Sequence, residues 1–134
     1  MKYRFLEHTG DIKFEVEGKT LAEIFENSVE AVSNYISRGG KIKSAKGKVI
    51  NVSGTDMGSL FYNFLDELIY LLDAENFIVA KAKVIIRGYN LRAELFGDNA
   101  KNYSDLDYIK AATYAEMYIK KTLKGWKAQA VLDV

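Results

Sequence analysis

The stretch Ile12–Ile36, IKFEVEGKTLAEIFENSVEAVSNYI, decides the fold class because a strand pattern is followed at once by a helix pattern. Its first six residues alternate strictly between apolar and charged, which is typical of a strand with one buried face. Residues Thr20–Glu23 then form a capping box, in which a threonine and a glutamate satisfy backbone N–H groups at a helix start. Apolar residues recur every three or four positions up to Ile36, and Gly39 and Gly40 predict the end of this helix.

The rest of the chain predicts one more helix and several strands. Leu60–Leu72 has a wide apolar face, and Ser53–Asp56 offers N-cap residues for it. Strands are predicted, from alternation or from β-branched and aromatic residues, at 3–6, 49–52, 77–87, 91–96, 109–119 and 126–132. Residues 97–107 are polar and predict a loop. Because strands and helices do not alternate regularly, we expect an α+β fold with both helices on a largely antiparallel or mixed sheet.

Composition excludes several classes of protein. The chain has 134 residues, which suits a single domain spanning 1–134, and its net charge of +1 provides no strong field for holding nucleic acid alone. It has no cysteine and one histidine, His8, which excludes a disulfide framework, a catalytic thiol and a multi-histidine metal centre. The N-terminal residues lack the apolar core of a signal peptide, and Leu60–Leu72 is too short and too charged to cross a membrane. We therefore expect a soluble, cytoplasmic protein.

Two segments contain residues that ligate hard cations. In His8-Thr9-Gly10-Asp11 the aspartate is a candidate cation ligand, although the local pattern alone favours a polar turn. At the other end, Asp133 precedes Val134 and its chain-end carboxylate, and such oxygen ligands suit Ca²⁺, Mg²⁺ or Mn²⁺. A solvated tail is the alternative, and it is favoured because sequence spacing does not tell whether the two segments meet.

Aromatic and basic residues near the C-terminal third allow a second interpretation. Tyr103, Tyr108 and Tyr114, with Lys101 and Lys110, have the side chains that stack on bases and pair with phosphates. Aromatic residues at strand spacing more often belong to the core, and we favour that interpretation.

Five blocks of the sequence together resemble the archease family. Glu7–Ile12 (EHTGDI) is similar to the archease signature E-H-T-A-D-I, and Trp126 with Val131–Val134 (VLDV) is similar to the closing strand of that family. Three further blocks lie between them in the family's order: Gly18–Phe25 (GKTLAEIF), Phe64–Leu71 (FLDELIYL) and Ile109–Tyr114 (IKAATY). The blocks cover nearly the whole chain.

The resemblance implies an accessory protein and not an enzyme. Archeases activate the RtcB-type RNA ligase, which joins a 2′,3′-cyclic phosphate or 3′-phosphate end to a 5′-hydroxyl end in tRNA splicing. They promote the metal-dependent guanylylation of the ligase and support multiple turnover. Two alternatives remain: a modulator of the specificity of a tRNA methyltransferase, and a small metal-dependent phosphohydrolase. The near-neutral charge suits docking on a protein, with indirect RNA contact.

The resemblance also assigns residues. Asp11, Asp133 and the chain-end carboxylate of Val134 would hold one divalent ion, with Ca²⁺, Mg²⁺ and Mn²⁺ as candidates. Asp11, Lys110 and Asp133 would carry ligase activation, and His8 and Thr9 of the signature would support them. The chain departs from the family at two positions. Gly10 replaces the usual alanine, and Ala115 stands where archeases commonly have histidine.

Overall fold

The computed structural model describes residues 2–7 and 9–134, and within them it contains eight strands, two α-helices and one 3-10 turn. In chain order these are β1 (Tyr3–Leu6), β2 (Asp11–Gly18), α1 (Leu21–Ile36), β3 (Lys46–Ser53), α2 (Met57–Glu75), β4 (Phe77–Arg87), β5 (Asn90–Asn99), the 3-10 turn (Ala100–Asn102), β6 (Ala111–Ala112), β7 (Tyr118–Thr122) and β8 (Gly125–Asp133).

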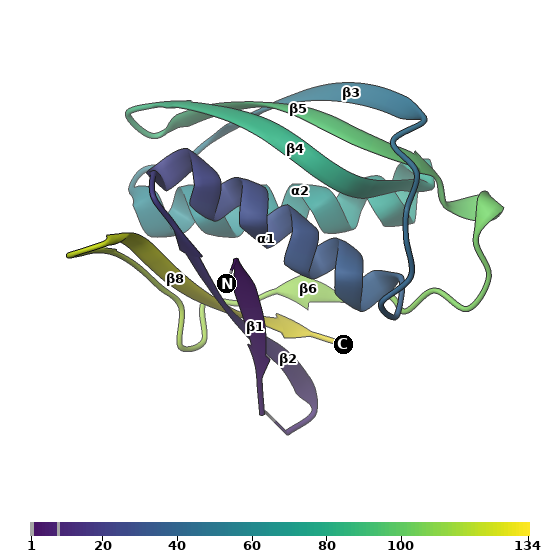
Figure 1. Cartoon of the computed structure of the whole chain (residues 1–134), viewed down its shortest axis with the longest axis horizontal. Coiled ribbons are helices and arrows are strands. Elements are labelled where there is room, and N and C mark those ends of the chain that lie inside the picture. The colour runs from purple at the N-terminus through teal and green to yellow at the C-terminus, as the bar shows by residue number, and fades with distance from the viewer. Residues whose placement is uncertain (1, 8) are drawn as a thin grey trace.

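The strands form two antiparallel sheets with both helices between them (Figure 1). One sheet has five strands, in the order β1-β2-β8-β6 with β7 also paired to β8, and the other has the order β3-β5-β4. Helix α1 contacts β4 on one side and β2 and β8 on the other, and α2 contacts both sheets as well. The predicted α+β class is thus confirmed, and the strands are divided between two sheets.

Both helices begin at the predicted caps. The Thr20 hydroxyl accepts from the Glu23 N–H at 3.2 Å, and the Glu23 carboxylate accepts from the Lys19 N–H at 3.3 Å. At the start of α2, the Asp56 carboxylate accepts from the Ser59 N–H at 2.7 Å in a reciprocal capping box. These bonds satisfy backbone donors that a helix start leaves without partners.

The core lies on both sides of the helix pair. Where the helices meet, the Phe25 ring contacts the rings of Phe61 and Phe64 edge-on, with centroids 5.4 and 5.2 Å apart. On the five-stranded sheet, buried Phe14 of β2 and alanines such as Ala130 of β8 face the helices. The small alanine side chains let α1 approach the sheet closely.

Two predicted segments differ from the structure. The predicted strand 109–119 is wrong as one element, because β6 ends at Ala112 and the chain turns before β7 begins at Tyr118. The reason is long-range: Tyr114 leaves the sheet to stack on Tyr62 of α2, with centroids 4.2 Å apart and an interplanar angle of 6°. The predicted loop 97–107 is wrong for its first three residues, which extend β5 to Asn99 by pairing with β4.

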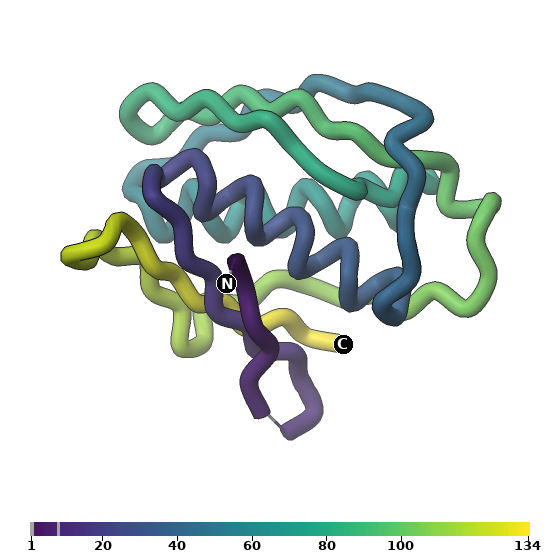
Figure 2. Tube along the Cα trace, viewed as in Figure 1, coloured from purple at the N-terminus to yellow at the C-terminus, as the bar shows by residue number. Residues whose placement is uncertain are grey.

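Two connecting segments run along one side of the molecule (Figure 2). Residues 37–45 leave the end of α1, and residues 103–110 return toward β6. The Asp107 N–H donates to the Ile36 carbonyl at 2.9 Å, and Arg38 forms an ion pair with the Asp107 carboxylate at 2.9 Å. The Tyr103 hydroxyl accepts from the Lys43 N–H at 2.9 Å. These contacts fix the segment that leads to Lys110. Within the described residues, no helix is both long and apolar enough to cross a membrane.

Candidate functional site

The pairing of β2 with β8 places Asp11 directly opposite Asp133. Residues directly opposite each other on antiparallel strands have Cβ atoms about 4.5–5.5 Å apart and point to the same side of the sheet. Their neighbours Ile12 and Leu132 are buried in the core beneath the helices, so the two aspartates lie on the outer face of the five-stranded sheet. We call Asp11 and Asp133 the aspartate pair.

Strand β6 places Lys110 beside this pair. The Lys110 N–H donates to the Asp133 carbonyl at 2.8 Å, and the next residue, Ala111, is the register partner of Asp133. The Lys110 residue is exposed. The start of β2, the end of β8 and Lys110 therefore meet at one end of the sheet. These three segments lie far apart in the sequence.

The other predicted site residues lie around the aspartate pair in different ways. Val134 follows Asp133 and is half-buried against the core. Thr9 is exposed just before β2, and Gly10 has a φ of 77°, which glycine adopts without steric cost. His8 lies outside the described residues. Ala115 is exposed in the turn between β6 and β7.

This turn crosses the outer face next to the aspartate pair. The Thr113 hydroxyl donates to the Val131 carbonyl at 2.8 Å, and Val131 is only 1% exposed although it points away from the helices. Lys13 lies two residues after Asp11 on β2 and points to the same face of the sheet. It forms an ion pair with Glu116 at 2.9 Å. The aspartate pair therefore has a lysine–glutamate ion pair as its neighbour along the strands.

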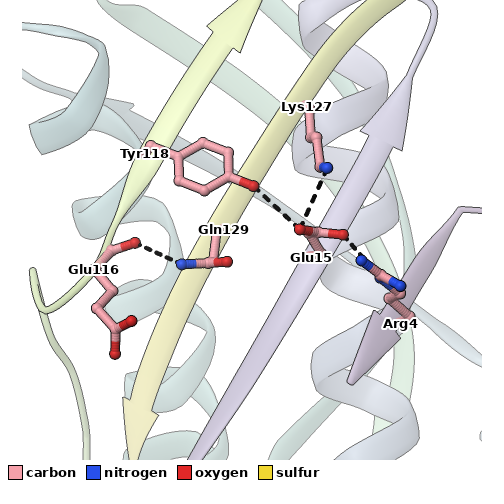
Figure 3. A network of polar contacts seen from close by, with 6 residues as sticks. All are labelled: Arg4, Glu15, Glu116, Tyr118, Lys127 and Gln129. Carbon is pink, nitrogen blue, oxygen red and sulfur yellow. Dashed lines mark hydrogen bonds and ion pairs between the residues drawn. The ribbon is translucent and has the colours of Figure 1, made fainter. Parts of the chain in front are cut away.

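Further along the outer face, three residues form a polar network around the Glu15 carboxylate (Figure 3). Arg4 of β1 donates to the Glu15 carboxylate at 2.8 Å, the Tyr118 hydroxyl of β7 donates at 3.2 Å, and Lys127 of β8 pairs with it at 3.4 Å. We call Arg4, Glu15, Tyr118 and Lys127 the Glu15 network. Beside it, the Gln129 side chain donates to the Glu116 carbonyl at 2.9 Å.

Glu15 is a charged residue that joins four strands. Its side chain is 11% exposed, and this burial alone would raise its pKa. The hydrogen bonds from Arg4, Lys127 and Tyr118 favour the ionised form and together outweigh burial, so the pKa of Glu15 lies below its ordinary value. The carboxylate thus stays ionised at neutral pH and holds β1, β2, β7 and β8 together.

The sequence prediction did not single out the Glu15 network. The signal was present in the alternation of residues 12–17, which puts Glu15 on the face opposite the core. Its partners come from three other strands, and only the register of those strands shows that opposite charges meet. Tyr103 likewise has a structural role, because its hydroxyl donates to buried Asp98 at 2.8 Å.

The aspartate pair fits part of a hard-cation site. Among the residues that the structure describes, no three Asp, Glu or His side chains are placed to hold a metal ion together. Asp11 and Asp133 supply carboxylate oxygens, which are the ligands that Ca²⁺, Mg²⁺ and Mn²⁺ take. A cation held by this pair would need further oxygens, from water, from Val134 or from another molecule.

Comparison with known proteins places this arrangement in a family context. Residues 3–134 match the model of the Archease protein family. A protein of Methanosarcina acetivorans named "Protein archease" is 36% identical over 99% of this chain and 96% of its own length, and one of Pyrococcus abyssi with the same name is 33% identical over 99% of both. These names state no enzymatic activity. The solution structure of protein 1598 of Methanobacterium thermoautotrophicum superposes with a TM-score of 0.80 at 25% identity, covering 98% of each chain.

Proposed function

Because the chain belongs to the archease family, we propose that it is a protein cofactor of an RtcB-type RNA ligase in tRNA splicing. In this role it promotes guanylylation of the ligase and multiple turnover, and it catalyses no reaction by itself. One observation carries the proposal: Asp11, Lys110 and Asp133 come from three distant parts of the sequence and meet at one end of the five-stranded sheet. These are the positions that the family resemblance singles out.

The aspartate pair supports a role in handling the divalent ion of the ligase reaction. Asp11 and Asp133 would hold the cation, with Val134 as a further oxygen source, and Ca²⁺, Mg²⁺ or Mn²⁺ would fit these ligands. A divalent cation supplies charge neutralisation for phosphoryl and nucleotidyl transfer. The exposed ammonium group of Lys110 contacts a phosphate or an acidic group of the ligase.

The surface charge suits a protein partner. The net charge of +1 is too small to hold an RNA strand by overall charge, so in the ligation reaction the RNA is held by the ligase. We also propose that the protein acts in the cytoplasm, together with its ligase partner.

The test is multiple-turnover ligation and ligase guanylylation, measured with and without the full chain in Mg²⁺ and in Mn²⁺. We expect stimulation by the wild type and a loss of about tenfold or more in Asp11→Asn, Asp133→Asn and Lys110→Ala. Asp66→Asn is the matched control, because Asp66 is an exposed carboxylate on α2 away from the aspartate pair. Melting temperatures of all variants separate a lost site from a lost fold.

Three outcomes would contradict the proposal. Equal stimulation by wild type and Asp133→Asn would remove the aspartate pair from the mechanism. If the chain does not stimulate the ligase in either metal but alters the specificity of a tRNA methyltransferase, its partner is the methyltransferase and not the ligase. Hydrolysis of a phosphoester by the chain alone would instead make it a metal-dependent phosphohydrolase.

A further inference from the structure

A pocket lies at the end of the β2–β8 pair opposite to the aspartate pair. The eight register pairs of these strands run from Asp11–Asp133 at one end to Gly18–Trp126 at the other. At roughly 3.3 Å per residue the two ends are about 23 Å apart. The pocket has a volume of about 760 Å³ and is lined by the β2–α1 turn, the start of α1 and the β7–β8 hairpin. We call it the Trp126 pocket.

Close backbone contacts shape the Trp126 pocket. Gly125 has a φ of 142°, and a Cβ at this position would lie 2.4 Å from the Gly18 carbonyl oxygen. A Cβ at Gly18 would in turn lie 2.8 Å from the Cβ of Glu23. The buried Asn27 side chain donates to the Glu17 carbonyl at 2.7 Å, which fixes the end of β2 against α1. These contacts hold the β2–α1 turn and the β7–β8 hairpin against each other, and side chains of both segments line the pocket.

The charges around the pocket favour an anion. Four lysines and two glutamates line it, which leaves a net charge of about +2. Lys2 and Lys127 already pair with Glu30 and Glu15. Lys19 and Lys124 are exposed and take part in no ion pair with another described residue. Two ammonium groups are thus available to a ligand, one from the β2–α1 turn and one from the β7–β8 hairpin.

The remaining lining favours a flat aromatic group. Trp126 is half-buried and lines the pocket, and indole rings stack favourably on planar heterocycles such as nucleobases. A volume of about 760 Å³ lies within the range of small-molecule sites and exceeds what a phosphate ion alone would fill. An aromatic wall beside two unpaired ammonium groups matches a heterocycle that carries a phosphate.

We propose that the Trp126 pocket binds a nucleotide, with its base against the Trp126 indole and its phosphate between Lys19 and Lys124. The nucleotide is either free or the terminal nucleotide of an RNA strand, since both present the same base and phosphate. This site is separate from the aspartate pair, and the inference does not rest on the ligase function proposed above.

The chain contains its own reporter for this site, because Trp126 is its single tryptophan. The full chain is titrated with a purine mononucleotide, the corresponding nucleoside, ribose 5-phosphate and inorganic phosphate, and tryptophan fluorescence is recorded. We expect saturable quenching by the mononucleotide, with affinities for the other three weaker by about tenfold or more. A single-stranded RNA with a terminal phosphate that binds more tightly than the mononucleotide would identify an RNA end, and equal binding would identify the free nucleotide.

Variants show whether the quenching arises in the pocket. The double change Lys19→Ala and Lys124→Ala should weaken mononucleotide binding by about tenfold. Lys83→Ala is the matched control, because Lys83 is an exposed lysine on the outer face of the other sheet, and it should leave binding unchanged. Asp11→Asn should also bind normally, which separates this site from the aspartate pair.

Three results would overturn the proposal. The first is quenching that does not saturate, and the second is quenching that is unchanged in the lysine double variant. The third is equal affinity for the mononucleotide and for inorganic phosphate, which would leave a surface anion site without base recognition. Trp126→Phe removes the fluorescent reporter, so its binding is measured by calorimetric titration. Phenylalanine keeps an aromatic wall in the pocket, and we therefore expect this variant to bind the mononucleotide more weakly than wild type but still measurably. A melting temperature within a few degrees of wild type shows that each variant is folded.

Discussion

Glu15 carries a buried charge that links four strands. Arg4, Tyr118 and Lys127 reach its carboxylate from β1, β7 and β8. Removing one member of such a network leaves the others desolvated without their partner, which costs more than the bond itself contributes. The outer face of the five-stranded sheet is therefore held by charge where the inner face is held by apolar packing.

The lowered pKa of Glu15 predicts that the protein loses stability in acid. A carboxylate with a lowered pKa in the folded state binds fewer protons there than in the unfolded state. Its contribution to the free energy of unfolding is complete above its unfolded pKa, near 4.5, and is lost as pH falls through the lower folded pKa. The pKa of Asp98 is lowered in the same sense, first by the hydrogen bond from Tyr103.

Urea unfolding of Glu15→Gln from neutral pH down to pH 3 tests this prediction. The variant should be less stable than wild type at neutral pH by about 1–3 kcal/mol, from the loss of charge-assisted hydrogen bonds. It should also lose less stability in acid, while the Asp66→Asn control should follow the wild-type pH profile. Parallel curves for Glu15→Gln and wild type would mean that the carboxylate has no lowered pKa.

At the residue scale, the candidate site was only partly predictable. Asp11 and Asp133 were singled out by resemblance to a family, whereas their local patterns favoured a turn and a tail. Their register pairing is a contact between the two ends of the chain, and no local pattern contains it. Glu15 has a clear local position on the outer face, but its partners are fixed by the pairing of four strands.

At the scale of single elements, β5 depends on the absence of one side chain. Gly97 is buried opposite Val79 of β4, next to the register shift between Val79 and Lys81. A Cβ at Gly97 would lie about 2.0 Å from the Ile78 carbonyl oxygen, which is backbone and has no room to move aside. We expect Gly97→Ala to lower the free energy of unfolding by about 1–3 kcal/mol or more.

Thermal unfolding checks the effect of Gly97→Ala. Gly47→Ala is the matched control, because Gly47 lies on β3, the other neighbour of β5, where a Cβ meets only the Leu95 carbonyl oxygen at 3.9 Å. Its melting temperature should stay much closer to wild type. Equal melting temperatures for the two variants would mean that β4 moves away from β5 without cost.

The elements that the sequence predicts well are those whose signals are local. The strand expected at 77–87 coincides with β4, and both helix caps are made by the residues that the pattern indicates. The segment 109–119 was predicted wrongly because stacking of Tyr114 on Tyr62 and the Thr113 bond to Val131 end β6 early. Both partners lie in other elements, so the local alternation was overridden by tertiary contacts.

At the scale of the whole molecule, the three layers predict an uneven resistance to local opening. Strands β5 and β8 each have partners on both sides, and their inner faces are buried by the helices. Strand β1 lies at the edge of its sheet and consists of four residues that are exposed or half-buried. Amide exchange slows with burial and with pairing on both sides.

Native-state hydrogen exchange measures this difference directly. Amides in the middle of β5 and β8 should exchange only on global unfolding, with a free energy equal to that from denaturant titration. Amides of β1 should exchange by local opening at a lower free energy. Uniform protection across both sheets would show that the molecule opens as one unit.

The position of β8 in its sheet has a consequence for how the protein is made. Among the strands that the structure describes, β8 comes last in chain order, yet it pairs with β2, β6 and β7. The helix α2 and the sheet of β3, β4 and β5 lie within residues 46–99 and can assemble as soon as they leave the ribosome. Until β8 follows, β2 presents an open edge to other chains in the cell. A translation product that stops before Gly125 lacks the middle of a sheet, so it is a target for proteolysis and aggregation.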